Sequence, residues 1–154
     1  MIRQLFYLIT LCSMFHSAGI PMFVQAVLSS EPSLCQRALL NRFMEDLFKV
    51  ASTQVNTNII DGELNDLPQF NALNILRSIF HDATLNNDVM RFVERGVVLT
   101  VHGFSSISWS VRNASTQLLS ALLPRMLGQR LSQEESSMQN MSTADIFFHR
   151  FVLL

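Results

Sequence analysis

Apolar residues recur along this chain at steps of three and four, the spacing of one face of an α-helix. The pattern is clearest in the stretch that ends at Gly128, where one apolar stripe comprises Val111, Ala114, Leu118, Ala121, Leu122 and Met126. Ser105, Ser106 and Ser108 come just before it, and each hydroxyl can accept a hydrogen bond from the unpaired N–H groups of a helix start. We therefore predict a helix that begins near Trp109 and ends at Gly128.

The same spacing predicts four earlier helices. Pro21 suits the first turn of a helix that continues to about residue 29. A second helix over 32–51 pairs with it as a hairpin, and a third occupies 68–83, with Phe80 among its inward residues. The fourth covers 89–102 and is ended by Gly103.

Polar stretches separate these helices and predict exposed loops. Residues 52–67 contain Asp61 and Gly62, a turn signal, and residues 129–141 show no apolar period. Ser142, followed three residues later by Asp145, resembles a capping box and predicts a last helix.

Composition supports a helical chain. Hydrophobic residues make up 49% and charged residues 15% of the 154 positions, too apolar for a disordered chain. Five glycines and four prolines are too few for an all-β chain full of tight turns. We predict an all-α fold in which about three helical hairpins form a HEAT/armadillo-like α-solenoid segment. The sequence shows no clear repeat period between the hairpins, so the pattern alone does not establish a solenoid.

The run from Val97 to Ser106 allows an enzymatic interpretation. It could be a buried strand leading to an exposed Ser105, as in the nucleophile elbow of α/β-hydrolases. The second glycine of that motif is replaced by Ile107, and no other strand-like runs exist to build the sheet. We predict no catalytic residue, and we interpret Gly103 as a helix end.

Metal and cofactor chemistry is not expected either. The four histidines (His16, His81, His102 and His149) have no ligand spacing, and Cys12 and Cys35 are too far apart for a metal pair. A glycine-rich phosphate loop and a dinucleotide fingerprint are both absent from the sequence. We predict no cofactor and no metal.

Three motifs carry a resemblance to a known family. They are Ser17-Ala18-Gly19-Ile20-Pro21, the run NALNILR over 71–77, and WSVRNA over 109–114. Together they resemble the THADA family of large all-helical proteins, from about Ser17 to about Phe148. The resemblance implies a fragment or short isoform, with an atypical apolar leader over 1–16 and a partial α-solenoid over 17–154.

The resemblance also implies a function. Family members act as non-catalytic scaffolds that regulate 2′-O-ribose methylation in the tRNA anticodon loop, and the enzyme is a partner methyltransferase subunit. The partners expected for this chain are therefore that subunit and tRNA, in the cytoplasm and without a membrane. A general α-solenoid interaction module with no tRNA role stays open as the alternative.

One departure from the family bears on activity. The family element linked to methylation reads Arg-Arg-Ser-Ala-Gly-Ile/Leu-Pro, and Ser17 to Pro21 match its remainder. Phe15 and His16 stand where the two arginines are expected. Because Phe cannot pair with a phosphate or carboxylate as a guanidinium does, we expect this chain to be inactive in supporting methylation.

Arginines are the candidate contact residues for RNA or a partner protein. They are Arg77, Arg91, Arg95 and Arg112, with Arg125 as a further candidate. Each has a structural alternative. Arg91 and Arg95 are one helical turn apart and could form a solvated face, whereas Arg112 could tie neighbouring hairpins together. The net charge of −1 gives no overall field that would attract nucleic acid.

Two further points concern Trp109 and the N-terminus. Trp109 is predicted to pack in the core or between helices rather than to stack on a base.

Residues 1–15 have one early arginine and a mostly apolar run, which also fits a signal peptide. A small secreted helical protein is therefore a further alternative, although the run is too short for a standard membrane span.

Overall fold

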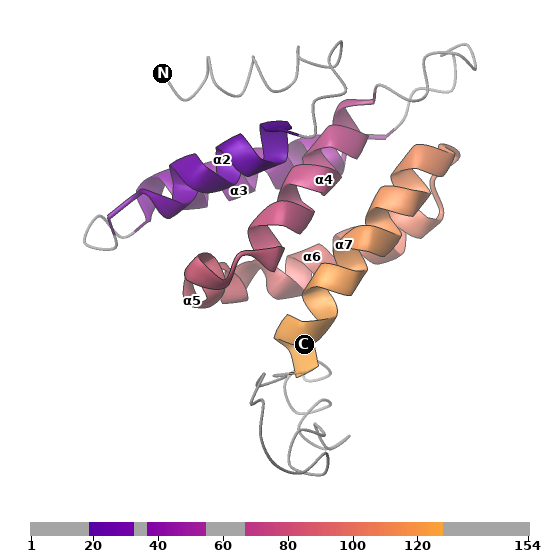
Figure 1. The fold of residues 1–154 in the computed structure, drawn as a ribbon. Coiled ribbons are helices and arrows are strands. Elements are labelled where there is room, and N and C mark those ends of the chain that lie inside the picture. Colours follow the sequence, from indigo (N-terminus) through magenta and orange to yellow (C-terminus); the bar gives the residue numbers. More distant parts are fainter. Residues whose placement is uncertain (1–18, 33–36, 55–66, 128–154) are drawn as a thin grey trace.

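A computed structural model describes residues 19–32, 37–54 and 67–127 of the chain (Figure 1). Every regular element among these residues is helical, so the prediction of an all-α fold is confirmed. The longer helices are α2 (Gly19–Ser29), α3 (Ala38–Ala51), α4 (Pro68–His81), α6 (Val93–Phe104) and α7 (Trp109–Leu127). Between α4 and α6 lie the short elements η3 (Ala83–Leu85), α5 (Asn86–Val89) and η4 (Met90–Phe92).

Helix α4 lies at the centre of the arrangement. It packs against α2 and α3 on one side and against α7 on the other. Helices α2 and α3 run in opposite directions, and so do α6 and α7, which follow each other through a tight turn (Figure 1). The described residues thus place α4 between two antiparallel helix pairs, an arrangement consistent with part of a helical solenoid.

One apolar core joins all five longer helices. Phe43 of α3, Phe80 of α4 and Leu118 of α7 are completely buried within it. The stripe predicted for the last helix is confirmed, because all six of its members are buried. Helix α7 also begins at Trp109 as predicted, whereas Gly128 and the helix predicted from Ser142 lie outside the described residues.

Helix α3 begins later than the sequence predicted. It starts at Ala38 rather than at residue 32, because the Glu31 carboxylate accepts hydrogen bonds from the N–H groups of Leu39 (2.8 Å) and Leu40 (3.0 Å). Arg37, just before the helix, has φ 50°, a left-handed conformation uncommon for a residue with a side chain. A distant carboxylate therefore caps this helix, a role that local spacing could not reveal.

The helix predicted over 89–102 is also different. The chain forms α5, then the 3₁₀ segment η4, then α6, so helical structure begins at Asn86 and is divided into three elements. Gly103 does not end the helix, since α6 continues to Phe104. A Cβ on Gly103 would lie 2.0 Å from Ser115 Oγ and 2.9 Å from Ser115 Cβ. The glycine is required because α6 and α7 approach closely there, and this helical segment excludes the hydrolase-elbow interpretation.

Candidate interaction surfaces

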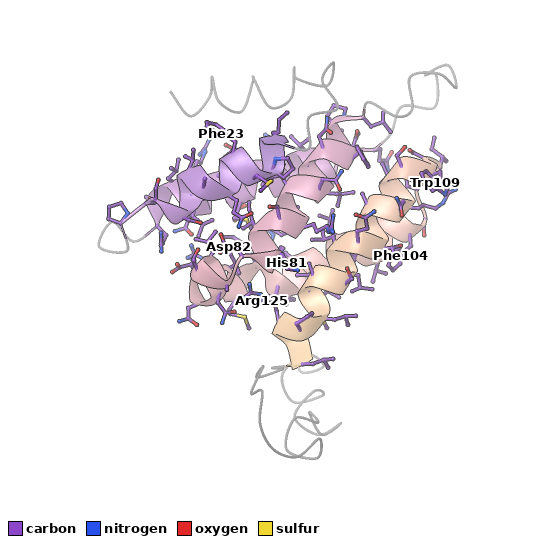
Figure 2. The ribbon with its side chains drawn as sticks, in the orientation of Figure 1. Phe23, His81, Asp82, Phe104, Trp109 and Arg125 are labelled. Carbon is purple, nitrogen blue, oxygen red and sulfur yellow. The ribbon has the colours of Figure 1, made fainter. Side chains whose placement is uncertain are left out.

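The motif Ser17–Pro21 is only partly described. Gly19, Ile20 and Pro21 form the first turn of α2, while Ser17 and Ala18 lie outside the described residues. Beside this turn, Met22 is 70% and Phe23 is 58% exposed, and Figure 2 shows Phe23 at the outer side of α2. The start of α2 therefore presents apolar side chains to solvent next to the matched motif.

Arg91 and Arg95 come together on one surface with an arginine that sequence analysis did not single out, Arg42 of α3. These three side chains line a shallow hollow between α3 and the η4–α6 segment. The Arg91 guanidinium lies 4.8 Å from the centre of the Phe92 ring, and that of Arg95 lies 4.6 Å from the centre of the Phe48 ring. The aromatic rings hold both guanidinium groups in place through cation–π attraction.

Carboxylates already neutralise much of this surface. Arg95 pairs with Glu45 at 2.6 Å, and Arg42 pairs with Asp46 at 3.3 Å. Both pairs are partly exposed, and ion pairs at a protein surface contribute about 0–1 kcal/mol to stability. Of the three arginines, Arg91 alone has no carboxylate partner within the described residues, which leaves little free positive charge for a phosphate backbone.

The other two candidate arginines lie elsewhere. Arg77 is exposed on α4. Arg112 donates hydrogen bonds to the carbonyl oxygens of Ser106 (2.7 Å) and Ile107 (2.9 Å), in the turn that precedes its own helix. It fixes this turn rather than tying neighbouring hairpins together.

Trp109 was predicted to pack in the core or between helices. This prediction was wrong, because the residue is 69% exposed.

Arg125 has a structural role that connects helix ends. Its Nε donates to the Phe80 carbonyl oxygen (2.8 Å), and its terminal nitrogen donates to the Asp82 carbonyl oxygen (2.7 Å) (Figure 2). Burial lowers the pKa of Arg125, and the Asp82 charge opposes that shift. The guanidinium stays charged and attaches α7 to the end of α4.

Sequence analysis missed the network around the Asp82 carboxylate. One oxygen accepts from Ser29 Oγ (2.8 Å), and the other accepts from the backbone N–H and the hydroxyl of Thr84 (2.7 Å each). Burial would raise the pKa of Asp82, but the hydrogen bonds from Thr84 and Ser29 outweigh it and hold the pKa below its usual range. Asp82 was predicted only as a residue near the end of the helix over 68–83, and the fold alone brings Ser29, 53 residues earlier, beside it.

A groove of about 680 Å³ lies between the end of α3, the start of α4, α6 and the turn before α7. Leu73, Leu99 and Val111 contribute apolar lining. Gln69, which is 7% exposed, donates from Nε2 to the Thr53 carbonyl oxygen at 3.2 Å. Its Oε1 atom is buried and accepts no hydrogen bond from the described residues. The volume is in the usual range for a binding site.

The described residues offer no metal cluster and no membrane span. Within residues 19–32, 37–54 and 67–127, no group of three or more His, Cys, Asp or Glu side chains could hold a metal ion. None of the helices in the described part is both long enough and apolar enough to cross a membrane.

Comparison with known proteins decides the family. Residues 3–110 match the family model described as THADA/TRM732, DUF2428, and residues 112–154 match the model described as Trm732, C-terminal TPR repeats. The chain belongs to the THADA/TRM732 family. The two matches meet near the start of α7, a helix that is packed against both α4 and α6. The described fold therefore continues across their boundary.

Members of this family are similar in sequence to nearly the whole of this chain. The tRNA (32-2′-O)-methyltransferase regulator THADA is 39% identical over 142 residues in Gallus gallus, covering 92% of this chain and 7% of the relative. The human protein of that name is 39% identical over 141 residues, covering 92% and 7%. The regulator trm732 of Schizosaccharomyces pombe is 29% identical over 140 residues, covering 90% and 9%. The chain thus spans less than a tenth of the length of these relatives, and no solved structure matches it.

Proposed function

We propose that this chain is a non-catalytic scaffold segment that takes part in regulating 2′-O-methylation of the tRNA anticodon loop, together with a partner methyltransferase in the cytoplasm. The observation that carries the proposal is the match over about nine tenths of the chain to proteins named regulators of a tRNA (32-2′-O)-methyltransferase. In this role the segment positions other molecules, and the partner subunit performs methyl transfer.

The described surface fits a scaffold of this kind. Several of its polar side chains hold helices and turns together. Arg112 donates to the α6–α7 turn, and Arg125 donates to the end of α4. Apolar side chains remain exposed at the start of α2 and at the α6–α7 turn. Surfaces with large exposed apolar groups are typical of proteins that bind other proteins.

A segment exchange tests the proposal. The homologous segment of a full-length relative is replaced by this chain with Phe15→Arg and His16→Arg, and the chimera is expressed in cells that lack their own regulator. We expect ribose methylation at tRNA position 32 to return, as measured by mass spectrometry of isolated tRNA. A soluble chimera that leaves position 32 unmethylated would contradict the proposed function.

The same chimera without the two arginine changes tests the role of Phe15 and His16. We propose that methylation then stays low, because the paired guanidinium groups of the family motif are missing. The unaltered 154-residue chain expressed alone should likewise fail to restore methylation. Full activity of either would show that the arginine pair is dispensable.

A further inference from the structure

Large apolar side chains gather on α6 and on the turn between α6 and α7. Their exposed fractions are 52% for Val98, 56% for Val101, 39% for Phe104, 59% for Ile107 and 69% for Trp109. We call these five residues the α6–α7 ridge. Figure 2 shows Phe104 and Trp109 at the same end of the molecule. Tryptophan is among the side chains that contribute most to protein–protein binding.

The ridge adjoins the groove described above. Val98 and Ile107 belong to the ridge and also line the groove, whose apolar lining continues to Leu73, Leu99 and Val111. A partner that covers the ridge could therefore place a side chain into a preformed apolar hollow. Such an anchor in a pocket is the usual centre of a protein interface.

Hydrogen bonds hold the turn that contains Ile107 and leads into Trp109, the first residue of α7, although these two side chains are exposed. Arg112 donates to two of its carbonyl groups, and the Ser108 N–H donates to Ser106 Oγ at 3.2 Å. Ser108 itself is 1% exposed. These hydrogen bonds fix the backbone of the turn before any partner binds. Less conformational entropy is then lost on binding, so the turn is preorganised for a partner.

Charge favours a protein partner over RNA. The charged residues that line the groove are Glu94 and Arg95, of opposite sign, and Arg95 is paired with Glu45. The guanidinium nearest to Trp109 in sequence, that of Arg112, is occupied by turn carbonyls. RNA binding depends on several free cations that neutralise phosphates, and this surface does not supply them. A near-neutral, apolar segment of a protein is complementary to it.

We propose that the α6–α7 ridge and its groove form the surface on which this segment docks the methyltransferase subunit, through an apolar, weakly charged segment of that enzyme. The proposal rests on the proposed function, because that function supplies the partner. The ridge provides the contact area, and the groove takes one anchoring side chain.

Fluorine NMR offers a direct test, because Trp109 is the only tryptophan of the chain. The full chain labelled with 5-fluorotryptophan gives one tryptophan signal, which reports on the ridge alone. It is titrated with the purified tRNA (32-2′-O)-methyltransferase of the source organism, and the Kd is measured by calorimetry. We expect the Trp109 signal to shift and broaden on binding.

Matched variants then locate the contact. Val101→Ser with Ile107→Ser should weaken binding by about tenfold or more while Trp109 remains as reporter. Leu123→Ser removes an exposed apolar group from the later part of α7, away from the ridge, and should change the Kd by less than about twofold. Circular dichroism checks that both variants keep their helix content.

Each other outcome overturns the proposal in a recognisable way. If neither the wild-type chain nor the variant with Phe15→Arg and His16→Arg binds the methyltransferase, the proposed function fails and the docking surface with it. If the enzyme binds but neither the Trp109 signal nor the ridge variant responds, the docking proposal alone is wrong. A Trp109 shift caused by self-association, or by a tRNA transcript without enzyme, would assign the ridge to a different partner.

Discussion

Phe80 and Trp109 show how differently two aromatic side chains of this chain are used. Phe80 was predicted to point inward and is completely buried, whereas Trp109 was predicted to pack and is 69% exposed. Local spacing could not separate the two cases, because both residues belong to helices with a strong apolar pattern. The Phe80 ring lies beside Gly96 of α6, whereas Trp109 stands at the first position of α7.

We expect Phe80→Ala to cost about 3–5 kcal/mol of unfolding free energy, because it leaves a cavity at the centre of the core. Urea denaturation followed by circular dichroism measures the change. Trp109→Ala is the matched control and should alter stability by no more than about 0.5 kcal/mol. Similar losses for both variants would mean that Phe80 is less important to the core than its burial indicates.

Arg112 is a second residue whose role depends on its partners. Arg112→Met keeps the apolar stem but removes the bonds to Ser106 and Ile107, so we expect a loss of about 1–2 kcal/mol in chemical denaturation. Arg91→Met is the comparison, since Arg91 is exposed and pairs with no carboxylate in the part of the chain that the structure describes. If Arg112→Met lowers the unfolding free energy less than Arg91→Met does, Arg112 does not stabilise the turn as proposed.

At the scale of elements, the pairing of α6 with α7 depends on small residues. Gly103 faces Ser115, and a Cβ on Gly96 would lie 3.0 Å from Leu122 Cδ1. The Leu122 side chain can give way by a few tenths of an ångström, but Ser115 is completely buried and its Oγ is bonded to the Val111 carbonyl oxygen. The α6–α7 spacing is therefore set at Gly103.

Gly103→Ala should destabilise the chain by about 1–3 kcal/mol, because the added methyl group overlaps Ser115. Adding Ser115→Gly removes both overlapping atoms, so the double variant should lose less than the sum of the two single changes. Thermal unfolding of the four proteins in this cycle measures the coupling. Strictly additive losses would show that the two helices are not in close contact at this point.

At the scale of the whole molecule, one polar network connects three helices that are distant in sequence. The Asp82 side chain binds Ser29 at the end of α2, and its carbonyl binds Arg125 of α7. The lowered pKa of Asp82 makes this network sensitive to acid. A carboxyl group with a lowered folded-state pKa stabilises the fold above its unfolded pKa and loses that contribution as the pH falls through the folded value.

We therefore expect the melting temperature to fall as the pH drops from about 5 to about 2, since an unfolded Asp titrates near pH 3.9. Asp82→Asn should lower the melting temperature at pH 7 and reduce its dependence on pH in this window. Thr84→Val should act in the same direction, because it removes one donor to the carboxylate. Thr116→Val is the control, since its hydroxyl donates to the Arg112 carbonyl oxygen at 3.1 Å and takes no part in the Asp82 network. An unchanged acid slope in Asp82→Asn would contradict the assignment.

The sequence by itself determined the helical class, the positions of most helices and the buried stripe of α7. It did so because a helix that covers a core must repeat its apolar residues every three to four positions. The family could also be recognised from short motifs that have a fixed order along the chain. These features depend on neighbouring residues, which a sequence displays directly.

Only the tertiary structure decided which polar residues meet and which apolar residues stay exposed. Glu31 caps a helix that starts at Ala38, Asp82 joins three helices, and Arg42 lies with Arg91 and Arg95. Helix α7 also continues through Pro124, where propensity favours a break, while Leu122 and Met126 on either side are buried in the core. The Glu31 cap spans eight to nine residues, and the other cases depend on contacts between residues far apart in sequence. The free energy of these tertiary contacts outweighs the local preference.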